Sequence, residues 1–204
     1  MTDTARFRCR CGKVGGQVAD ASPRTANRMV CYCDDCQAFL HRLGRADLLD
    51  AHGGSDIVQV APAVVTFDRG TDEIVGLRLT PKGLIRWYAS CCNTPVGNTV
   101  GPALPFIGII AQAFDDADRA FGKPAGASFG KFAVGTPPEG ATGLNLPLIV
   151  GALRKILGWK LRGKTWPHPF FDRESRKPIR PITVLTAEER EALRPLCGPR
   201  ASES

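Results

Sequence analysis

The sequence predicts a mainly β protein that carries a C-terminal extension with one or two helices. From residue 1 to about 115, short runs of β-branched and aromatic residues are separated by Gly and Pro turn signals. Residues 125–143 are rich in Gly and Pro, which indicates a long connection. Beyond this connection, apolar residues recur at helical spacing. We therefore expect a zinc-binding β domain at residues 1–115 and a basic, loop-rich extension at residues 116–204 that packs on it.

The predicted strands are short and lie in the β domain. Four segments contain the β-branched and aromatic residues typical of strands, and alternation is clearest in the last two: residues 13–18, 63–69, 74–80 and 84–90. A fifth segment, PFIGIIA at residues 105–111, is short and apolar. Periodicity alone does not distinguish a buried strand from a helix segment, and the short length favours a buried strand.

Two helices are predicted in the extension. Asn145 can cap the first helix just before Pro147. Over residues 146–162 apolar side chains recur every three or four positions: Ile149, Leu153, Ile156, Leu157 and Leu161. Lys and Arg flank this stripe, a pattern also typical of helices on a membrane surface, but docking on the β core is the simpler explanation. Thr186 and Glu189 can form a capping box, which predicts a second helix at residues 186–195.

The net charge of +7 is concentrated near the C-terminus. Residues 151–204 contain twelve Lys or Arg against six Asp or Glu. Such a region can face nucleic acid, an anionic membrane or an acidic small molecule, but we favour a solvated basic face because surface charge mostly serves solubility. Residues 165–181 mix aromatic and basic side chains, a pattern that can bind nucleic acid. Packing of Trp166, Phe170 and Phe171 on the β core is the interpretation that we favour.

The sequence predicts a cytoplasmic protein that does not cross a membrane. The first residues, MTDTARFRCRCGK, contain no apolar core of a secretory signal. The longest apolar runs are shorter than the roughly 20 residues that a membrane-spanning helix requires. In the cytoplasm thiols stay reduced, so clustered cysteines hold a metal more often than they form disulfides. The oligomeric state is left open by the sequence.

The eight cysteines form clusters, of which the densest is CYCDDCQ at residues 31–37. Disulfides, a metal and a reactive nucleophile are the alternatives for its three thiols. Three thiolates on one zinc ion leave a position open to water or substrate, which is how catalytic zinc differs from structural zinc. Cys31, Cys33 and Cys36 therefore predict a zinc site of the catalytic type.

Cys9 and Cys11 belong to a second group. One spacer residue places both side chains on the same face of an extended chain, so two thiolates can reach one ion. A structural zinc site takes four protein ligands, and Cys91 with Cys92 is the only distant pair in the sequence. Cys197 stands alone, and we expect it to be neither a ligand nor a nucleophile.

Three motifs follow one another in a recognisable order: C-x-C-G at residues 9–12, C-x-C-x-x-C-Q at 31–37, and a Cys followed by x-T-P at 92–95. This order resembles the glutathione-dependent formaldehyde-activating enzymes and their centromere-protein-V relatives, which share the Mss4-like, mainly β fold. The resemblance covers about residues 7–111. It implies a structural zinc and a second zinc that binds or activates the glutathione thiol. The implied ligands are Cys9, Cys11 and Cys92 for the first ion and Cys31, Cys33 and Cys36 for the second.

The sequence departs from this family at two places. The family's late motif is C-x-x-C-G-T-P, and its earlier ligand position falls here on Ala89, which cannot bind metal. Cys91 is the expected substitute, but it joins Cys92 on one ion only if the chain turns sharply between them, because adjacent strand residues point to opposite faces. NTPVGN at residues 93–98 is suitable for a turn. The segment after Gln37 also lacks the Lys-Ser-x-Gly-Ser-like pattern of the family.

The resemblance implies a carbon–sulfur lyase that joins a small thiol such as glutathione to a small aldehyde, with two zinc ions per chain. Arg28, Arg42, Arg45 and the basic extension are candidates for holding the glutathione carboxylates. Two alternatives stay open. One is a non-enzymatic zinc module whose basic region binds a partner such as nucleic acid. The other is a redox sensor built on the three-cysteine motif.

Overall fold

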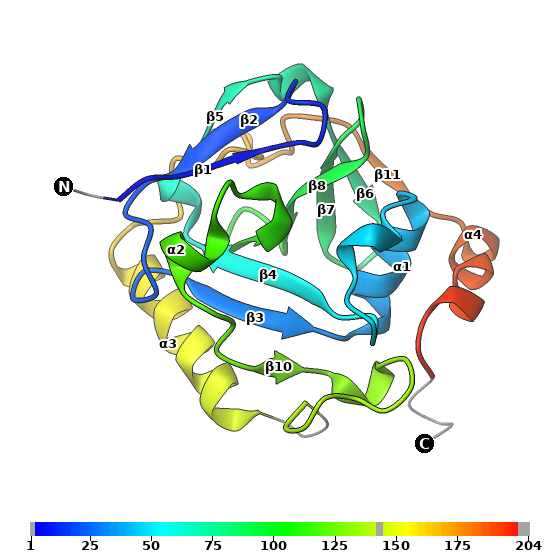
Figure 1. The fold of residues 1–204 in the computed structure, drawn as a ribbon. Coiled ribbons are helices and arrows are strands. Elements are labelled where there is room, and N and C mark those ends of the chain that lie inside the picture. The colour runs from blue at the N-terminus through cyan, green and yellow to red at the C-terminus, as the bar shows by residue number, and fades with distance from the viewer. Residues whose placement is uncertain (1–2, 142–144, 200–204) are drawn as a thin grey trace.

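The computed structural model describes residues 3–141 and 145–199, which fold around two β-sheets (Figure 1). The smaller sheet has the strand order β1-β2-β5, with β1 at Ala5–Arg8, β2 at Gly15–Val18 and β5 at Val65–Arg69. The larger sheet has the order β10-β3-β4-β9-β8-β7-β6-β11. Its strands are β3 (Asn27–Cys31), β4 (Ser55–Val60), β6 (Ile74–Arg78), β7 (Ile85–Ala89), β8 (Thr94–Thr99), β9 (Ile107–Ile110), β10 (Ala127–Ser128) and β11 (Ile182–Val184). The predicted mainly β class is confirmed.

Segments beyond residue 115 form both edges of the larger sheet. Its central strands pair antiparallel. β10 pairs parallel with β3 at one edge, and β11 pairs parallel with β6 at the other. The extension therefore completes the sheet whose strand β3 ends at Cys31. A division into two domains near residue 115 stays a prediction.

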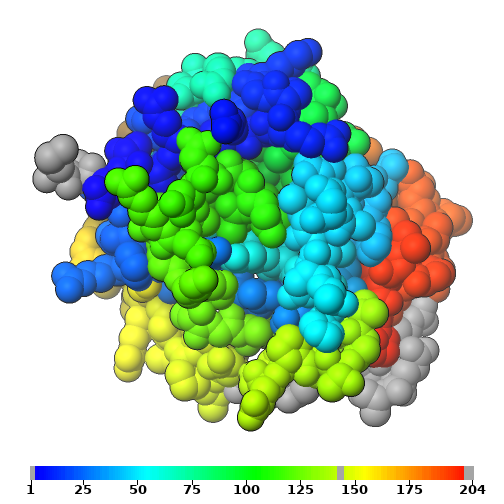
Figure 2. Space-filling model, viewed as in Figure 1, coloured from blue at the N-terminus to red at the C-terminus, as the bar shows by residue number. Residues whose placement is uncertain are grey.

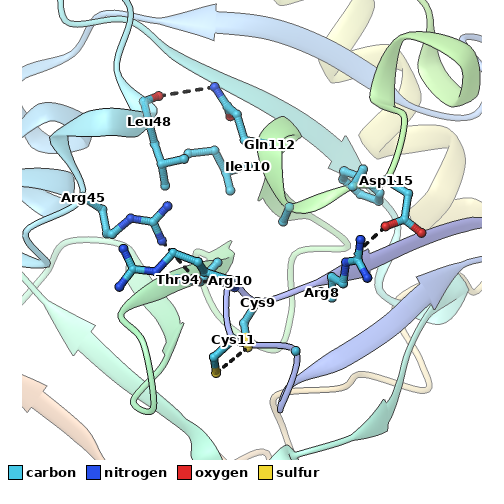
Figure 3. Close-up of a pocket in the computed structure, with 13 residues that line it drawn as sticks. Arg8, Cys9, Arg10, Cys11, Arg45, Leu48, Thr94, Ile110, Gln112 and Asp115 are labelled. Atoms are coloured by element: carbon cyan, nitrogen blue, oxygen red, sulfur yellow. Dashed lines mark hydrogen bonds and ion pairs between the residues drawn. The ribbon is translucent and has the colours of Figure 1, made fainter.

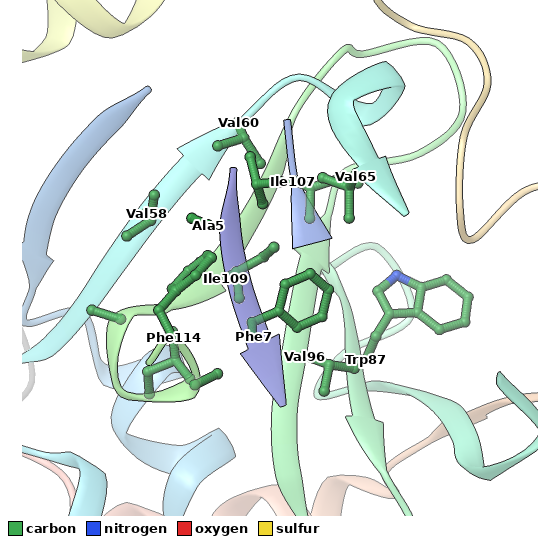
Figure 4. Packing of buried hydrophobic residues seen from close by; sticks show 14 of the residues in the cluster. Ala5, Phe7, Val58, Val60, Val65, Trp87, Val96, Ile107, Ile109 and Phe114 are labelled. Carbon is green, nitrogen blue, oxygen red and sulfur yellow. The ribbon is translucent and has the colours of Figure 1, made fainter. Parts of the chain in front are cut away.

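The core lies between the two sheets, where apolar side chains converge around Phe7 (Figure 4). The Phe7 ring packs edge-on against Phe67, with ring centroids 5.2 Å apart. From the extension, Phe170 stacks on Trp87 with centroids 4.6 Å apart, and Phe171 packs against the same indole. Both phenylalanines are buried, so the predicted packing of these aromatic residues on the β core is confirmed.

Four α-helices lie within the described residues: α1 (Asp34–Arg42), α2 (Ala117–Phe121), α3 (Leu146–Leu161) and α4 (Ala187–Ala192). The predicted helices at 146–162 and 186–195 are confirmed as α3 and α4. Asn145 caps α3 by accepting from the Leu148 N–H, and Thr186 with Glu189 forms the predicted capping box. Helix α1 was not predicted. It begins directly after Cys33 and buries the side chains of five residues: Cys36, Gln37, Ala38, Phe39 and Leu40.

The docking predicted for the apolar stripe of α3 is only partly correct. Trp159 is buried, and Lys155 turns inward, where its ammonium donates to the Pro23 carbonyl at 2.9 Å. In contrast, Leu153, Leu157 and Leu161 are 57–79% exposed. The helix is apolar on two faces, and only one of them lies on the protein. Among the described helices, none combines the length and apolar character that crossing a membrane demands.

His168 provides a test of the aromatic packing through pH. Its ring is buried, packs edge-on against Phe171, and accepts the Phe170 N–H at Nδ1. Burial lowers the pKa of His168 from 6.5 to about 4. Between these values the unfolded chain binds the proton and the folded chain does not, so stability falls as the pH is lowered. We expect a loss of about 2 kcal/mol from this group between pH 7 and pH 5.

The measurement is denaturant unfolding of the parent and of His168→Gln at both pH values, with the same excess of zinc. The free-energy advantage of the parent over the variant should shrink by about 2 kcal/mol on going from pH 7 to pH 5. Metal loss at the lower pH affects both proteins and cancels in the difference. An advantage that stays constant would mean that His168 is not held neutral in the core.

Candidate metal centres

Four thiols from two distant parts of the chain gather in a cluster that we call the four-cysteine cluster: Cys9, Cys11, Cys91 and Cys92. Their sulfur atoms all lie within 4.8 Å of one another. Individual distances are 3.5 Å for Cys9 to Cys11 and 3.3 Å for Cys11 to Cys91. Tetrahedral zinc with Zn–S bonds of ~2.3 Å places its sulfurs about 3.8 Å apart. The cluster therefore has the donor set and spacing to hold a metal ion.

The turn between β7 and β8 allows Cys91 and Cys92 to share this cluster. Their sulfurs are 3.9 Å apart. The turn spans residues 90–93, with Asn93 in the left-handed region at φ 55°, a conformation that Asn adopts more easily than most residues. The Asn93 side chain donates to the Leu43 carbonyl and fixes the turn against the protein. The sharp turn expected between Cys91 and Cys92 is therefore present, and it ends before Thr94, which begins β8.

Thr94 organises the polar surroundings of the four-cysteine cluster. Its hydroxyl accepts the Arg10 N–H and the Arg45 guanidinium, each at 3.0 Å, and lies 3.2 Å from the Cys92 sulfur. Although burial acts to raise it, the hydrogen bond from Thr94 lowers the pKa of Cys92 to about 6. Arg10, Arg45 and Thr94 line a cavity of about 510 Å³ together with Cys9 and Cys11 (Figure 3). One thiol of this cluster is thus ready to act as a thiolate ligand at neutral pH.

Cys31, Cys33 and Cys36 form the second group, which we call the three-cysteine cluster. Cys31 ends β3, Cys33 is the N-cap of α1, and Cys36 lies in the first turn of that helix. The sulfurs of Cys31 and Cys33 are 3.3 Å apart, and all three lie within 4.8 Å. Within the described residues this group contains no fourth His, Cys, Asp or Glu. The structure brings the three thiols together, and the arrangement could hold a metal ion.

Arg86 lies against the three-cysteine cluster and was not anticipated from the sequence. It projects from β7, is only 2% exposed, and places Nη1 3.7 Å from the Cys36 sulfur. Hydrogen bonds from the Cys31 and Cys33 thiols, with the charge of Arg86, hold the pKa of Cys36 well below its ordinary value. A buried guanidinium needs a negative partner, and the thiolate provides one. The sequence contained one signal that could have identified Arg86, namely a cation between Ile85 and Trp87 in an otherwise apolar strand.

Gln37 is a second residue whose role sequence reasoning did not identify, although it belongs to the C-x-C-x-x-C-Q motif. Its side chain is fully buried. Nε2 donates to the carbonyls of Tyr32 and Phe132 at 2.7 and 2.8 Å, and Oε1 accepts the Gly198 N–H at 2.8 Å. All its bonds go to the backbone of three separate segments. Gln37 therefore ties the loop of the three cysteines to the extension.

The three-cysteine cluster opens into a cavity of about 530 Å³, walled on one side by α3. Two cations line it, Arg86 and Lys131. The arginines expected to hold a carboxylate ligand do not line it. Arg28 is paired with Asp56 and Asp118, Arg42 lies near Glu189, and Arg45 belongs to the cavity of the four-cysteine cluster.

The C-terminal segment packs directly on α1 (Figures 1 and 2). Arg190 and Arg194 donate to Asp34 in the first turn of α1, at 3.2 and 2.8 Å. Cys197 donates to the Leu193 carbonyl and lies in neither cysteine cluster. These contacts hold the helix that carries Cys36 without adding a ligand to it.

Metal content per chain tests the two clusters separately. We expect two equivalents of zinc in the parent and one each in Cys36→Ser and Cys92→Ser, because each variant removes a ligand from a different cluster. Cys197→Ser, which changes a thiol outside both clusters, is the matched control and should keep two equivalents. Elemental analysis of protein purified without added metal gives the values. Loss of both ions in either cysteine variant would contradict two independent sites.

Replacing Arg86 tests its role beside the thiolates. Arg86→Met removes the charge that offsets three negative sulfurs, and we expect the zinc affinity of the three-cysteine cluster to fall about 10- to 100-fold. The zinc affinity of Arg86→Lys, which keeps the charge, should lie between the affinities of the parent and of Arg86→Met. Competition against a chromophoric zinc chelator measures the affinities, and Arg119→Met on the exposed face of α2 serves as control. A zinc affinity of Arg86→Met that is unchanged at both clusters would show that Arg86 has no part in metal binding.

The comparisons with known proteins place most of the chain in one family. Residues 1–183 match the model of a Family of unknown function (DUF6151). No significant match was found among the curated proteins. Because the match covers most of the chain, with both cysteine clusters and α3, the chain belongs to this family of unknown function.

Proposed function

We propose that this protein binds two zinc ions and acts as a thiol-dependent carbon–sulfur lyase at the three-cysteine cluster. The observation that carries the proposal is the difference between the clusters. Both clusters line a cavity, but one has four thiols, the number that closes a structural zinc site, and the other has three, which leaves one position for a ligand. The difference matches that between structural and catalytic zinc sites.

The residues of the chain have distinct parts in this proposal. Cys31, Cys33 and Cys36 hold the ion, and Arg86 offsets the negative charge of the three sulfurs. When bound, the ion supplies Lewis acidity and lowers the pKa of a thiol that reaches its open position. A ligand placed against the apolar wall of the cavity would limit access of water, which strengthens electrostatic interactions inside it.

The reaction is the reversible addition of a thiol to an aldehyde. The sulfur–carbon bond forms while the second bond of the carbonyl breaks, and the thiol proton ends on the oxygen. Nothing is oxidised or reduced, so no further reactant is needed. In the reverse direction the carbon–sulfur bond breaks and thiol and aldehyde are released. The motif order shared with the formaldehyde-activating enzymes supports this reaction, with glutathione and a small aldehyde as the first substrates to test.

The alternative of a nucleic-acid-binding zinc module has less support. Phe170 and Phe171, which the sequence offered for stacking on bases, are buried in the core. Arg190 and Arg194 of the basic extension pair with Asp34. Two of the aromatic residues that would form such an interface are thus inside the protein, whereas Arg173, Arg176 and Lys177 of the same segment are exposed.

The lyase proposal is tested by the rate at which formaldehyde and a thiol exchange with their adduct, followed by NMR exchange spectroscopy. The zinc-loaded parent should accelerate exchange about 100-fold or more over the uncatalysed rate. Cys36→Ser should return the exchange rate to its uncatalysed value, whereas Cys197→Ser should exchange at the rate of the parent. Zinc X-ray absorption in the same samples should change when thiol is added. A parent no faster than Cys36→Ser would refute the lyase proposal.

A further inference from the structure

We infer that the cavity beside the three-cysteine cluster binds a ligand with an uncharged, apolar body, such as an alkyl thiol or alkyl aldehyde, in preference to a charged peptide thiol. The assignment of a thiol or aldehyde group to this ligand rests on the proposed function. The apolar body is argued from the cavity alone and does not depend on the lyase reaction.

The size and walls of the cavity fit an organic ligand. Its volume of about 530 Å³ lies in the range of sites for small organic molecules. Apolar side chains come from both sides. Met29, Ile57 and Phe106 form part of one wall, and Leu148, Ile149 and Ala152 of α3 form part of the other. A ligand between them would remove apolar surface from water on both faces.

The charges in the cavity do not suit a tripeptide with two carboxylates. Arg86 is buried beside Cys36 and within 3.8 Å of Asp35, so its charge is already matched. Lys131 is the other cation that lines the cavity, and its ammonium lies over the Phe132 ring at 4.9 Å. Asp35 brings a negative charge to the same cavity. The two carboxylates of such a tripeptide would find one exposed lysine, whereas an apolar ligand body would contact the apolar walls.

The rim of the cavity exposes apolar side chains that a ligand would cover. Phe129 is 53% exposed and Leu153 is 59% exposed, and both line the cavity. Phe129 also holds a left-handed backbone with φ of 63°, an unfavourable conformation for a bulky residue. Strain of this kind is often found at ligand sites. The protein thus keeps a large aromatic ring in a costly position where it can contact the ligand.

The dependence of affinity on chain length provides the test. We would titrate the zinc-loaded full-length protein with straight-chain 1-alkanethiols and 1-alkanols of two to eight carbons by isothermal calorimetry. Each added methylene that enters the cavity should tighten binding about fourfold. 1-Octanethiol should bind more tightly than glutathione. 1-Octanol should still bind to Cys36→Ser, because its binding depends on the walls and not on the thiols.

Three variants connect this binding to the cavity. Ala152→Phe fills the space and should abolish the gain with chain length, whereas Val150→Phe, on the exposed face of the same helix, should leave it intact. Phe129→Gly removes a wall while relieving the left-handed backbone. It should weaken 1-octanol binding without lowering the unfolding temperature, so the effect cannot be attributed to misfolding.

The outcomes separate this inference from the lyase proposal. Affinities that do not rise with chain length, or glutathione binding more tightly than 1-octanethiol, would overturn the apolar body. A rise with chain length in which thiols bind no more tightly than alcohols of the same length would support the apolar body and count against thiol chemistry at the three-cysteine cluster. A rise that persists in Ala152→Phe would place the ligand elsewhere and refute the assignment to this cavity.

Discussion

The crowding of thiols into two clusters, where thiolates would repel one another, is the constraint on which the rest of this structure depends. In each cluster the sulfurs lie within 4.8 Å, where two negative charges repel by on the order of 3 kcal/mol at an effective dielectric constant of about 20. A divalent cation turns this repulsion into attraction. In the four-cysteine cluster it would also join Cys9 to Cys91, which are 82 residues apart, and so close a long loop between the two sheets. Metal binding at the four-cysteine cluster would therefore be coupled to folding.

The extension takes part in building the three-cysteine site. It supplies β10 beside β3, the wall of the cavity from α3, and the arginines that pair with Asp34. Gln37 links the cysteine loop to the backbone of Phe132 and Gly198 through hydrogen bonds shielded from water. A truncation after residue 115 would remove these partners and leave buried polar groups of the β domain unpaired.

The buried surroundings of the three-cysteine cluster would affect the binding of a metal ion and of a ligand together. Burial of Arg86 against Cys36 strengthens their electrostatic interaction, because little water screens it. An apolar ligand in the adjoining cavity would exclude more water and reinforce this effect. The cavity beside the four-cysteine cluster differs, since it is lined by Arg8, Arg10 and Arg45. The two cysteine clusters thus lie in environments of opposite character, polar for the four thiols and apolar for the three.

The sequence by itself determined the features that depend on neighbours along the chain. Three kinds of feature depend only on local sequence, so the sequence pattern predicts them. They are the cysteine spacings within residues 9–11 and 31–36, the helix caps at Asn145 and Thr186, and the buried strand in the apolar run at residues 105–111. Tertiary structure alone decided that Arg86 meets Cys36 across 50 residues, that Gln37 bonds to Gly198, and that Leu157 and Leu161 of α3 face outward. These contacts depend on which surfaces meet after long loops close, and local periodicity carries no information about that choice.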